Sequence, residues 1–213
     1  MKRWPAHIVR EYGPFEGVVH VHGLTFDGAR VWFAVGDRLL AMDPASGATV
    51  DALVVPARAG TAFDGRYLYQ IAGERIQKID PANGDVVATI PTPGPDGANS
   101  GLAWAEGTLW VGQYRARKIL QIDPHTGAVL RTLESNRYVT GVTWVDGELW
   151  HATWEGEQSD IRHIDPKTGE VLERLEMPEG VFVSGLESDG AGLFYAGGGG
   201  SGKVRAVRRP RGE

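Results

Sequence analysis

One hairpin occurs four times in this chain, and it constrains the fold more than any other feature. Each copy places Asp-Pro, a variable residue, Ser, Asn or Thr, and then Gly between two apolar segments; the copies read AMDPASGATV, KIDPANGDVV, QIDPHTGAVL and HIDPKTGEVL. In such a turn the Asp carboxylate accepts hydrogen bonds from backbone N–H groups, Pro fixes φ at about −65°, and Gly takes the left-handed conformation. The sequence therefore predicts four antiparallel hairpins.

A second unit lies upstream of each hairpin and occurs five times. The copies start at Gly23, Gly60, Gly101, Gly141 and Gly185, and read GLTFDGARVWFAV, GTAFDGRYLYQIA, GLAWAEGTLWVGQ, GVTWVDGELWHAT and GLESDGAGLFYAG. A period of about forty residues with four short strands in each period is typical of β-propeller blades. Helical repeats of similar length are excluded, because no window carries an apolar stripe with a period of about 3.6 residues.

The fifth unit has no hairpin of its own, because the chain ends after its third strand. Residues 6–12, AHIVREY, have the alternating pattern of the missing outer strand. Supplying it from the N-terminus would remove two open sheet edges and close the ring. We therefore predict an all-β fold: one domain over residues 1–213, a single five-bladed propeller of four-stranded antiparallel blades that start near residues 23, 60, 101, 141 and 185.

Composition narrows the choice of partner. The formal net charge is −5, which argues against a nucleic-acid binder, and no segment approaches the roughly 18 apolar residues that a membrane-spanning helix needs. The first residues lack the apolar core of a signal peptide. We expect a cytoplasmic monomer, unless a leader has been removed, with a small molecule or peptide as ligand and neither nucleic acid nor membrane as partner.

Aromatic residues recur on the second strand of every blade, at Trp32, Tyr69, Trp110, Trp150 and Phe194. A position that is aromatic in every blade favours packing between blades over ligand binding. Function is expected where equivalent positions differ. Two rings of such positions stand out: the residues immediately before each repeat glycine with those two residues earlier, and the residues that follow each packing aromatic.

These differing positions supply the candidate site residues at the mouth of the central channel. The candidate catalytic groups are His22 and His151, and the candidate ligand-binding residues are His20, Phe33, Gln70, Tyr138, Trp154 and Tyr195. His20, His22 and His151 together are compatible with a divalent metal such as zinc, with Glu155 or Glu157 as a fourth donor. A polar ligand pocket without metal and a purely structural role for the histidines are the alternatives.

Four stretches follow one another along the chain: VHGLTFDGARVWFAVG, GRYLYQIAGERIQKID, SGLAWAEGTLWVG and TWVDGELWHATWEGEQSDIRHIDPKTG. Blade by blade they resemble the plant and bacterial type of glutaminyl cyclase, also called glutamine cyclotransferase. That family is a group of five-bladed propellers that cyclise N-terminal glutamine to pyroglutamate. Gln70 after Tyr69, and Trp154, match the family's pattern.

The sequence departs from the family where the resemblance would place chemistry. Phe33 stands where the family has a glutamate, Thr140 and Gly141 replace an Asn-Glu pair, and the fifth-blade loop, Gly198–Ser201, lacks a lysine. Cyclisation needs a group that moves a proton from the α-amine to the departing ammonia, and phenylalanine cannot do this. The sequence therefore predicts that the usual glutaminyl cyclase chemistry is absent.

Three functions are compatible with these sequence features. The first is a glutamine cyclotransferase-like propeller that binds a small molecule or peptide end over its channel. The second is a lyase or hydrolase that uses a metal or a histidine base in the same channel, since streptogramin lyases share these blade patterns. The third is a protein-interaction scaffold. Fold alone does not choose among them.

Overall fold

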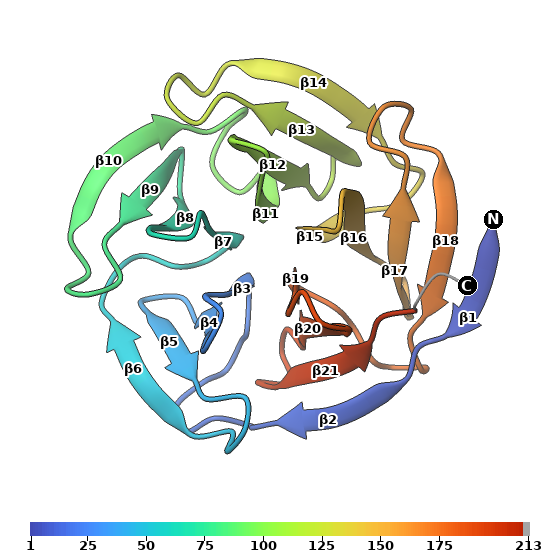
Figure 1. The fold of residues 1–213 in the computed structure, drawn as a ribbon, viewed down its shortest axis with the longest axis horizontal. Helices are drawn as coiled ribbons and strands as arrows, with labels where there is room; N and C mark the ends of the chain where they lie inside the picture. Colours follow the sequence, from blue (N-terminus) through green and yellow to red (C-terminus); the bar gives the residue numbers. More distant parts are fainter. Residues whose placement is uncertain (211–213) are drawn as a thin grey trace.

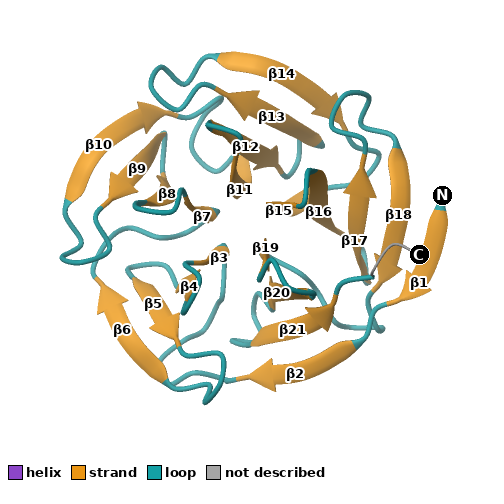
Figure 2. Ribbon diagram, viewed as in Figure 1, coloured by secondary structure: helices purple, strands orange, loops and turns teal. Residues whose placement is uncertain are grey.

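The computed structural model describes residues 1–210, so the last three residues of the expected domain lie outside it. The described residues form five blades arranged in a ring around a central axis (Figure 1). We call the space along this axis the channel. The described part is built from strands and loops (Figure 2), and it contains no helix long and apolar enough to cross a membrane. The predicted all-β, five-bladed fold is confirmed.

Each blade is named here by its place along the chain, and its strands are given from the channel outwards. Blade 1 is β3 (Leu24–Phe26), β4 (Val31–Ala34), β5 (Leu39–Met42) and β6 (Thr49–Leu53). Blade 2 is β7 (Thr61–Phe63), β8 (Leu68–Ala72), β9 (Arg75–Ile79) and β10 (Val86–Pro91). Blade 3 is β11 (Asn99–Ala105), β12 (Thr108–Gln113), β13 (Lys118–Ile122) and β14 (Val129–Glu134). Blade 4 is β15 (Val139–Val145), β16 (Glu148–Glu155), β17 (Gln158–Ile164) and β18 (Val171–Glu176). Blade 5 is β19 (Leu186–Ser188), β20 (Leu193–Gly197), β21 (Val204–Arg208) and β2 (Ile8–Tyr12).

The N-terminal segment closes the ring as predicted. β2 pairs antiparallel with β21, with Tyr12 opposite Val204 and Ile8 opposite Val207. The Tyr12 hydroxyl donates a hydrogen bond to Pro44 O of blade 1 at 2.9 Å, so this strand also ties blade 5 to its neighbour. Residues from the two ends of the chain thus complete one sheet.

One strand was not predicted. β1 (Lys2–Pro5) lies outside blade 4 and pairs parallel with β18, which gives that blade a fifth strand (Figure 1). All four of its residues are exposed. Its sequence, KRWP, has no apolar alternation, so no periodic pattern announced it.

The four Asp-Pro turns have the predicted chemistry. Asp43 Oδ1 accepts a hydrogen bond from Ala45 N at 2.9 Å, and Asp123 Oδ1 accepts one from His125 N at 2.8 Å. The four turn glycines have positive φ: Gly47 80°, Gly84 79°, Gly127 73° and Gly169 77°. The repeated Gly is therefore required by the backbone conformation.

The hydrophobic core is divided among the wedges between neighbouring blades. Each of its five clusters in the described residues joins two blades, as Trp32 of β4 does with Leu68 of β8. In blades 2 and 3, the aromatic residue of the second strand fills the wedge by packing on an aromatic residue of the next blade's innermost strand. Tyr69 stacks on Trp104 at 5.4 Å between ring centroids, and Trp110 stacks on Trp144 at 6.0 Å.

In blade 5 the repeated aromatic position is held by a different residue from the one that the sequence predicted. Tyr195 pairs with Glu187 as Trp32 pairs with Thr25, so Tyr195, and not Phe194, occupies the repeated position. The turn before β20 is one residue longer than the turn in blade 1, which shifts the alignment. Phe194 instead packs on Trp150 at 5.0 Å. It fills the wedge because Ser188 stands where the other innermost strands carry an aromatic residue.

Steric contact between neighbouring blades explains why each repeat unit begins with glycine. Gly23, Gly60, Gly101, Gly141 and Gly185 lie where the innermost strands approach one another around the axis. A Cβ added to any of them would lie less than 3.0 Å from backbone atoms of the next blade, and the contacts close on themselves, because Gly185 faces His22 and Gly23. We call these five residues the glycine ring. The channel is narrowest at this ring, because only glycine lets the backbones of neighbouring innermost strands come so close.

Candidate binding site at the channel mouth

A small pocket lies on one side of the glycine ring, where the loops that lead into the innermost strands gather. It is lined by all five residues that precede the ring glycines: His22, Ala59, Ser100, Thr140 and Ser184. The cavity volume is about 360 Å³. Pockets for small ligands in proteins are about 300–1,000 Å³, so this one lies at the small end of that range. We call it the mouth pocket.

Other side chains complete the walls of the mouth pocket. Arg58, Asn99, Tyr114 and Trp154 line it together with Gly23 and Gly97. Tyr114 stacks on Tyr138 with 4.8 Å between ring centroids, and Trp154 stacks on Phe182 with 4.6 Å. The Trp154 indole N–H donates to Gly156 O at 3.0 Å, which fixes the orientation of the ring. Two paired aromatic groups therefore contribute to the rim.

A second recess adjoins the mouth pocket and shares Trp154 with it. His20, Phe182 and Arg205 line this recess together with Gly180 and the loop 198–201. His20 and His22 stack with 5.8 Å between ring centroids, so the two recesses are also joined by this pair. Burial, His20 and Arg58 lower the pKa of His22. The His22 imidazole is therefore held toward its neutral form.

Two polar groups of the mouth pocket are unusual, because they are buried and unpaired. Asn99 is 6% exposed and Thr140 is 5% exposed, yet neither Asn99 Nδ2 nor Thr140 Oγ1 has a hydrogen-bond partner among the described residues. The hydroxyls at the positions equivalent to Thr140 in two other blades do have partners. Ser100 Oγ donates to Val139 O at 2.7 Å, and Ser184 Oγ donates to Val21 O at 2.6 Å. A buried polar group without a partner costs about 1–3 kcal/mol, so unpaired groups at a pocket wall favour a ligand role.

The structure brings part of the predicted site together. His22 and Trp154 line the mouth pocket, His20 lines the adjoining recess, and Tyr138 stacks on the pocket residue Tyr114. The prediction that the residues before the repeat glycines gather at one end of the channel agrees with this geometry.

The structure places four other predicted residues away from the mouth. His151, which is 1% exposed, borders a separate cavity with Glu134, Ser135 and Asn136 of blade 3. Burial lowers the pKa of His151 to about 4. His151 therefore does not share a cavity with His20 and His22, contrary to the expectation from the sequence.

Phe33, Gln70 and Tyr195 are likewise buried between blades. Phe33 packs on Phe15 with 4.7 Å between ring centroids, and Tyr195 packs on Phe26 with 5.7 Å. Gln70 has its hydrogen bonds satisfied: its Oε1 accepts from Thr61 Oγ1 at 2.6 Å and its Nε2 donates to Ala59 O at 3.1 Å. The residues that follow the packing aromatics therefore lie between blades and do not form a ring at the channel mouth, contrary to the expectation from the sequence.

The second ring was misplaced because both faces of a blade are covered by neighbouring blades. Alternate residues of a strand point to opposite faces, so Trp32 faces blade 2 and Phe33 faces blade 5. Neither face of β4 opens to the mouth. Asn99, Arg58 and Tyr114 were not among the predicted site residues. Only their position in the repeat could have indicated them: Arg58 and Asn99 lie two residues before a repeat glycine, and Tyr114 begins the loop after the second strand of blade 3.

The geometry gives no support to the predicted metal site. Among residues 1–210, no group of three or more His, Asp or Glu side chains lies close enough together to hold a metal ion. His20 and His22 form a pair, but a stable site for zinc needs three or four protein donors. The residues present do not fit such a site.

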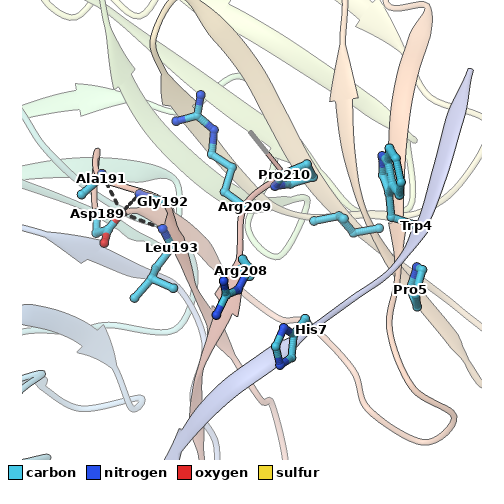
Figure 3. Close-up of a pocket in the computed structure, with 11 residues that line it drawn as sticks. Trp4, Pro5, His7, Asp189, Ala191, Gly192, Leu193, Arg208, Arg209 and Pro210 are labelled. Carbon is cyan, nitrogen blue, oxygen red and sulfur yellow. Dashed lines mark hydrogen bonds between the residues drawn. The ribbon is translucent and has the colours of Figure 1, made fainter. Parts of the chain in front are cut away.

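A cavity larger than the mouth pocket lies elsewhere, on the outside of the ring between blades 4 and 5 (Figure 3). It has a volume of about 680 Å³, and the residues that line it include Trp4 and Pro5 of β1 and Arg208 and Arg209. The Asp189 carboxylate at its edge already accepts hydrogen bonds from the backbone of Ala191, Gly192 and Leu193, each at 2.8 Å. Arg209 Nε, on a residue that lines this groove, is also buried without a partner, but the Arg209 guanidinium is held by Asp146 at 2.7 Å and by Glu148 at 3.3 Å. The mouth pocket has unpaired groups on two different side chains and is therefore the better candidate site.

The fold and this pocket define a five-bladed β-propeller with a small, partly polar site at one end of its channel. The family model described as glutamine cyclotransferase matches residues 131–196, which run from β14 to β20 and cover less than a third of the chain. Glutaminyl cyclase from Myxococcus xanthus has a similar structure, with a TM-score of 0.80 and 19% identity over 97% of each chain. The resemblance to glutamine cyclotransferases is thus confirmed, in a family signature and in the whole fold.

Two other propellers are similar at a lower level. The β-propeller domain of Cps50 (Swd1) from Myceliophteria thermophila has a TM-score of 0.52 and 14% identity, over 90% of this chain and 64% of that one. The WD40 β-propeller domain of Doa1 has a TM-score of 0.56 and 18% identity, over 88% and 63%. These likenesses concern the fold. No curated protein matches the chain.

Proposed function

We propose that this protein is a glutamine cyclotransferase-like propeller that binds a small molecule or the end of a peptide in the mouth pocket. The observation that carries the proposal is the pair of buried, unpaired groups at its wall, Asn99 Nδ2 and Thr140 Oγ1. Both atoms are closed to solvent in this structure, so a small shift of the two side chains toward the pocket would let a ligand with hydrogen-bond acceptors satisfy both. The aromatic rings of Tyr114 and Trp154 provide the apolar contact that small-molecule sites combine with a few polar groups.

We also propose that the pocket does not perform the usual cyclase reaction. No Asp or Glu is among the described residues that line the mouth pocket or the His20 recess. A carboxylate is the group best suited to hold a protonated α-amine, and cyclisation also requires a group that moves that proton. His22 is the side chain in the mouth pocket that could move a proton, but the charge of Arg58 beside it would repel a cationic amine.

The reaction is tested with a peptide that begins with glutamine. We expect the rate of pyroglutamate formation to equal the rate without protein, measured by mass spectrometry over hours. Turnover far above that background would overturn the second part of the proposal, whatever the ligand.

The binding is tested by a fragment screen followed by NMR. We expect fragments that shift the Asn99 side-chain amide resonances, and Thr140→Val should weaken them because it removes a hydroxyl while keeping volume. Thr132→Val is the matched control, since Thr132 lies exposed on β14, the outermost strand of blade 3. If every fragment bound elsewhere, or if Thr140→Val and Thr132→Val behaved alike, the mouth pocket would not be the binding site.

A further inference from the structure

The charge around the mouth differs from that of the whole chain. The chain has a formal net charge of −5, with 27 Asp and Glu against 22 Lys and Arg. The mouth pocket and the adjoining recess are nevertheless lined by two arginines and two histidines, Arg58, Arg205, His20 and His22, with no carboxylate among the described residues that line them. Arg205 Nε lies 3.5 Å from Glu11 Oε2, and His22 is held toward its neutral form, so Arg58 is the cation that carries the positive charge at the mouth. Arg58 is exposed and makes no salt bridge to a described residue. A local excess of positive charge in an acidic protein favours an anionic ligand.

The unpaired groups at the pocket wall are hydrogen-bond donors, and one of them is held in place. Gln113 Nε2 donates to Asn99 Oδ1 at 3.2 Å and also donates to Pro93 O. This contact uses the acceptor of the Asn99 amide and leaves its N–H₂ group unpaired. Thr140 adds a hydroxyl that can donate. The fixed amide and the free hydroxyl therefore call for acceptor atoms on the ligand.

The walls and the volume limit the rest of the ligand. Tyr114 and Trp154 line the pocket together with the donors, and each stacks on a second ring, Tyr138 and Phe182 respectively. A cavity of about 360 Å³ accepts one aromatic ring with a short polar substituent. Stacked aromatic side chains bind flat groups well because the rings prefer offset stacking at about 4.5–7 Å.

From these three observations we infer that the ligand of the mouth pocket is a carboxylate attached to a flat aromatic group. This inference rests on the proposed function and adds the chemical class of the ligand. The carboxylate accepts from Asn99 Nδ2 and Thr140 Oγ1 and is attracted by Arg58. The ring lies against Tyr114 or Trp154. Such a carboxylate belongs either to a free aromatic acid or to the C-terminus of a peptide that ends in an aromatic residue.

The class is tested with three compounds of nearly equal shape: phenylacetate, phenylacetamide and phenethylamine. Binding is measured by calorimetry, and the site by the NMR shift of the Asn99 side chain. We expect phenylacetate to bind at least about tenfold more tightly than phenylacetamide, and phenethylamine to bind least, because charge-assisted hydrogen bonds are roughly twice as strong as neutral ones.

Two variants locate the charge effect. Arg58→Gln should remove most of the preference for phenylacetate over phenylacetamide while leaving phenylacetamide binding nearly unchanged. Arg66→Gln is the control, because Arg66 is exposed in the turn at the other end of blade 2. If both variants lost the preference equally, the effect would come from the net charge and not from the pocket.

Peptides separate the two sources of the carboxylate. N-acetyl-Ala-Ala-Phe is compared with its C-terminal amide, and both are compared with phenylacetate. Tighter binding of the free-acid peptide than of phenylacetate points to peptide C-termini, and the reverse order points to free aromatic acids; either order supports the inference. If phenethylamine or the amides bound best at the Asn99 site, the carboxylate inference would be overturned while the proposed function stood. If none of the probes and no fragment shifted Asn99, both would be overturned.

Discussion

The Thr25 hydroxyl donates a hydrogen bond of 2.7 Å to Glu187, and the two residues lie in the innermost strands of neighbouring blades. Thr143, from the innermost strand on the other side of Glu187, donates to the same carboxylate. Ser188 N donates to Glu187 Oε1 at 2.9 Å. One carboxylate thus connects blades 4, 5 and 1 near the axis.

Removal of this carboxylate should destabilise the ring. Glu187→Ala leaves two hydroxyls on residues that are 0% exposed, Thr25 and Thr143, without their acceptor. We expect a loss of about 2–5 kcal/mol in the free energy of unfolding, since each buried unpaired group costs about 1–3 kcal/mol. Glu187→Gln keeps an acceptor and should cost less than half as much. Urea unfolding measures both, and an equal loss in the two variants would show that the hydrogen bonds are not the cause.

Acid should destabilise the fold through His151. Burial lowers the pKa of His151 to about 4, whereas an unfolded histidine has a pKa of about 6.5. Between pH 6.5 and pH 4 the unfolded chain binds a proton that folded His151 does not, so this contribution to stability is lost as the pH falls. The difference corresponds to up to about 3 kcal/mol.

The measurement compares wild type with His151→Gln by urea unfolding at pH 7 and at pH 5. The variant should lose less stability than wild type over this interval. Burial raises the pKa of Glu187, which acts in the opposite direction, because a folded group that retains its proton loses stability as the pH rises. The comparison between variant and wild type removes that shared effect. Equal losses would contradict the assigned role of His151.

The glycine ring should not tolerate a methyl group. In Gly141→Ala the new Cβ would lie 2.5 Å from Leu186 N and 2.7 Å from Gly185 C, both backbone atoms of blade 5. Backbone cannot move aside as a side chain does, so we expect a loss of about 3 kcal/mol or a failure to fold. The neighbouring Thr140→Val nearly keeps the side-chain volume and removes an unpaired buried hydroxyl, so its stability should equal or exceed that of wild type. A fully stable Gly141→Ala would show that the blades are further apart than described.

The two N-terminal strands should differ sharply in importance. Deletion of residues 1–5 removes β1, whose residues are all exposed, and should change the melting temperature by a few degrees at most. Deletion of residues 1–12 also removes β2 and exposes an edge on β21, together with the contact of Tyr12 to blade 1. We expect that protein to aggregate or to lose its cooperative unfolding. Similar behaviour of the two truncations would refute closure by β2.

The blade number and the closing strand were predictable because turn chemistry and hydrophobic period repeat in the sequence. Gly47 and its counterparts need positive φ, and one missing hairpin implied one strand from the N-terminus. The strand β1 was not predictable, because its pairing with β18 depends on tertiary structure and not on an apolar pattern.

Half of the site was predictable for the same reason. His22 and Thr140 precede ring glycines, so a count of residues placed them at the mouth. His151 and Phe33 were misplaced because strand alternation tells which residues share a face but not what covers that face. Tyr195 was shifted by a single extra residue in a turn, which a repeat alignment without gaps does not detect.

The central claim, that the mouth pocket is the ligand site, is tested most directly by a crystal structure with phenylacetate at millimolar concentration. We predict density for the compound beside Asn99 and Thr140, with its carboxylate within hydrogen-bond distance of Asn99 Nδ2 and Thr140 Oγ1. Density confined to the larger groove between Trp4 and Arg208, with the mouth pocket holding only water, would contradict the account.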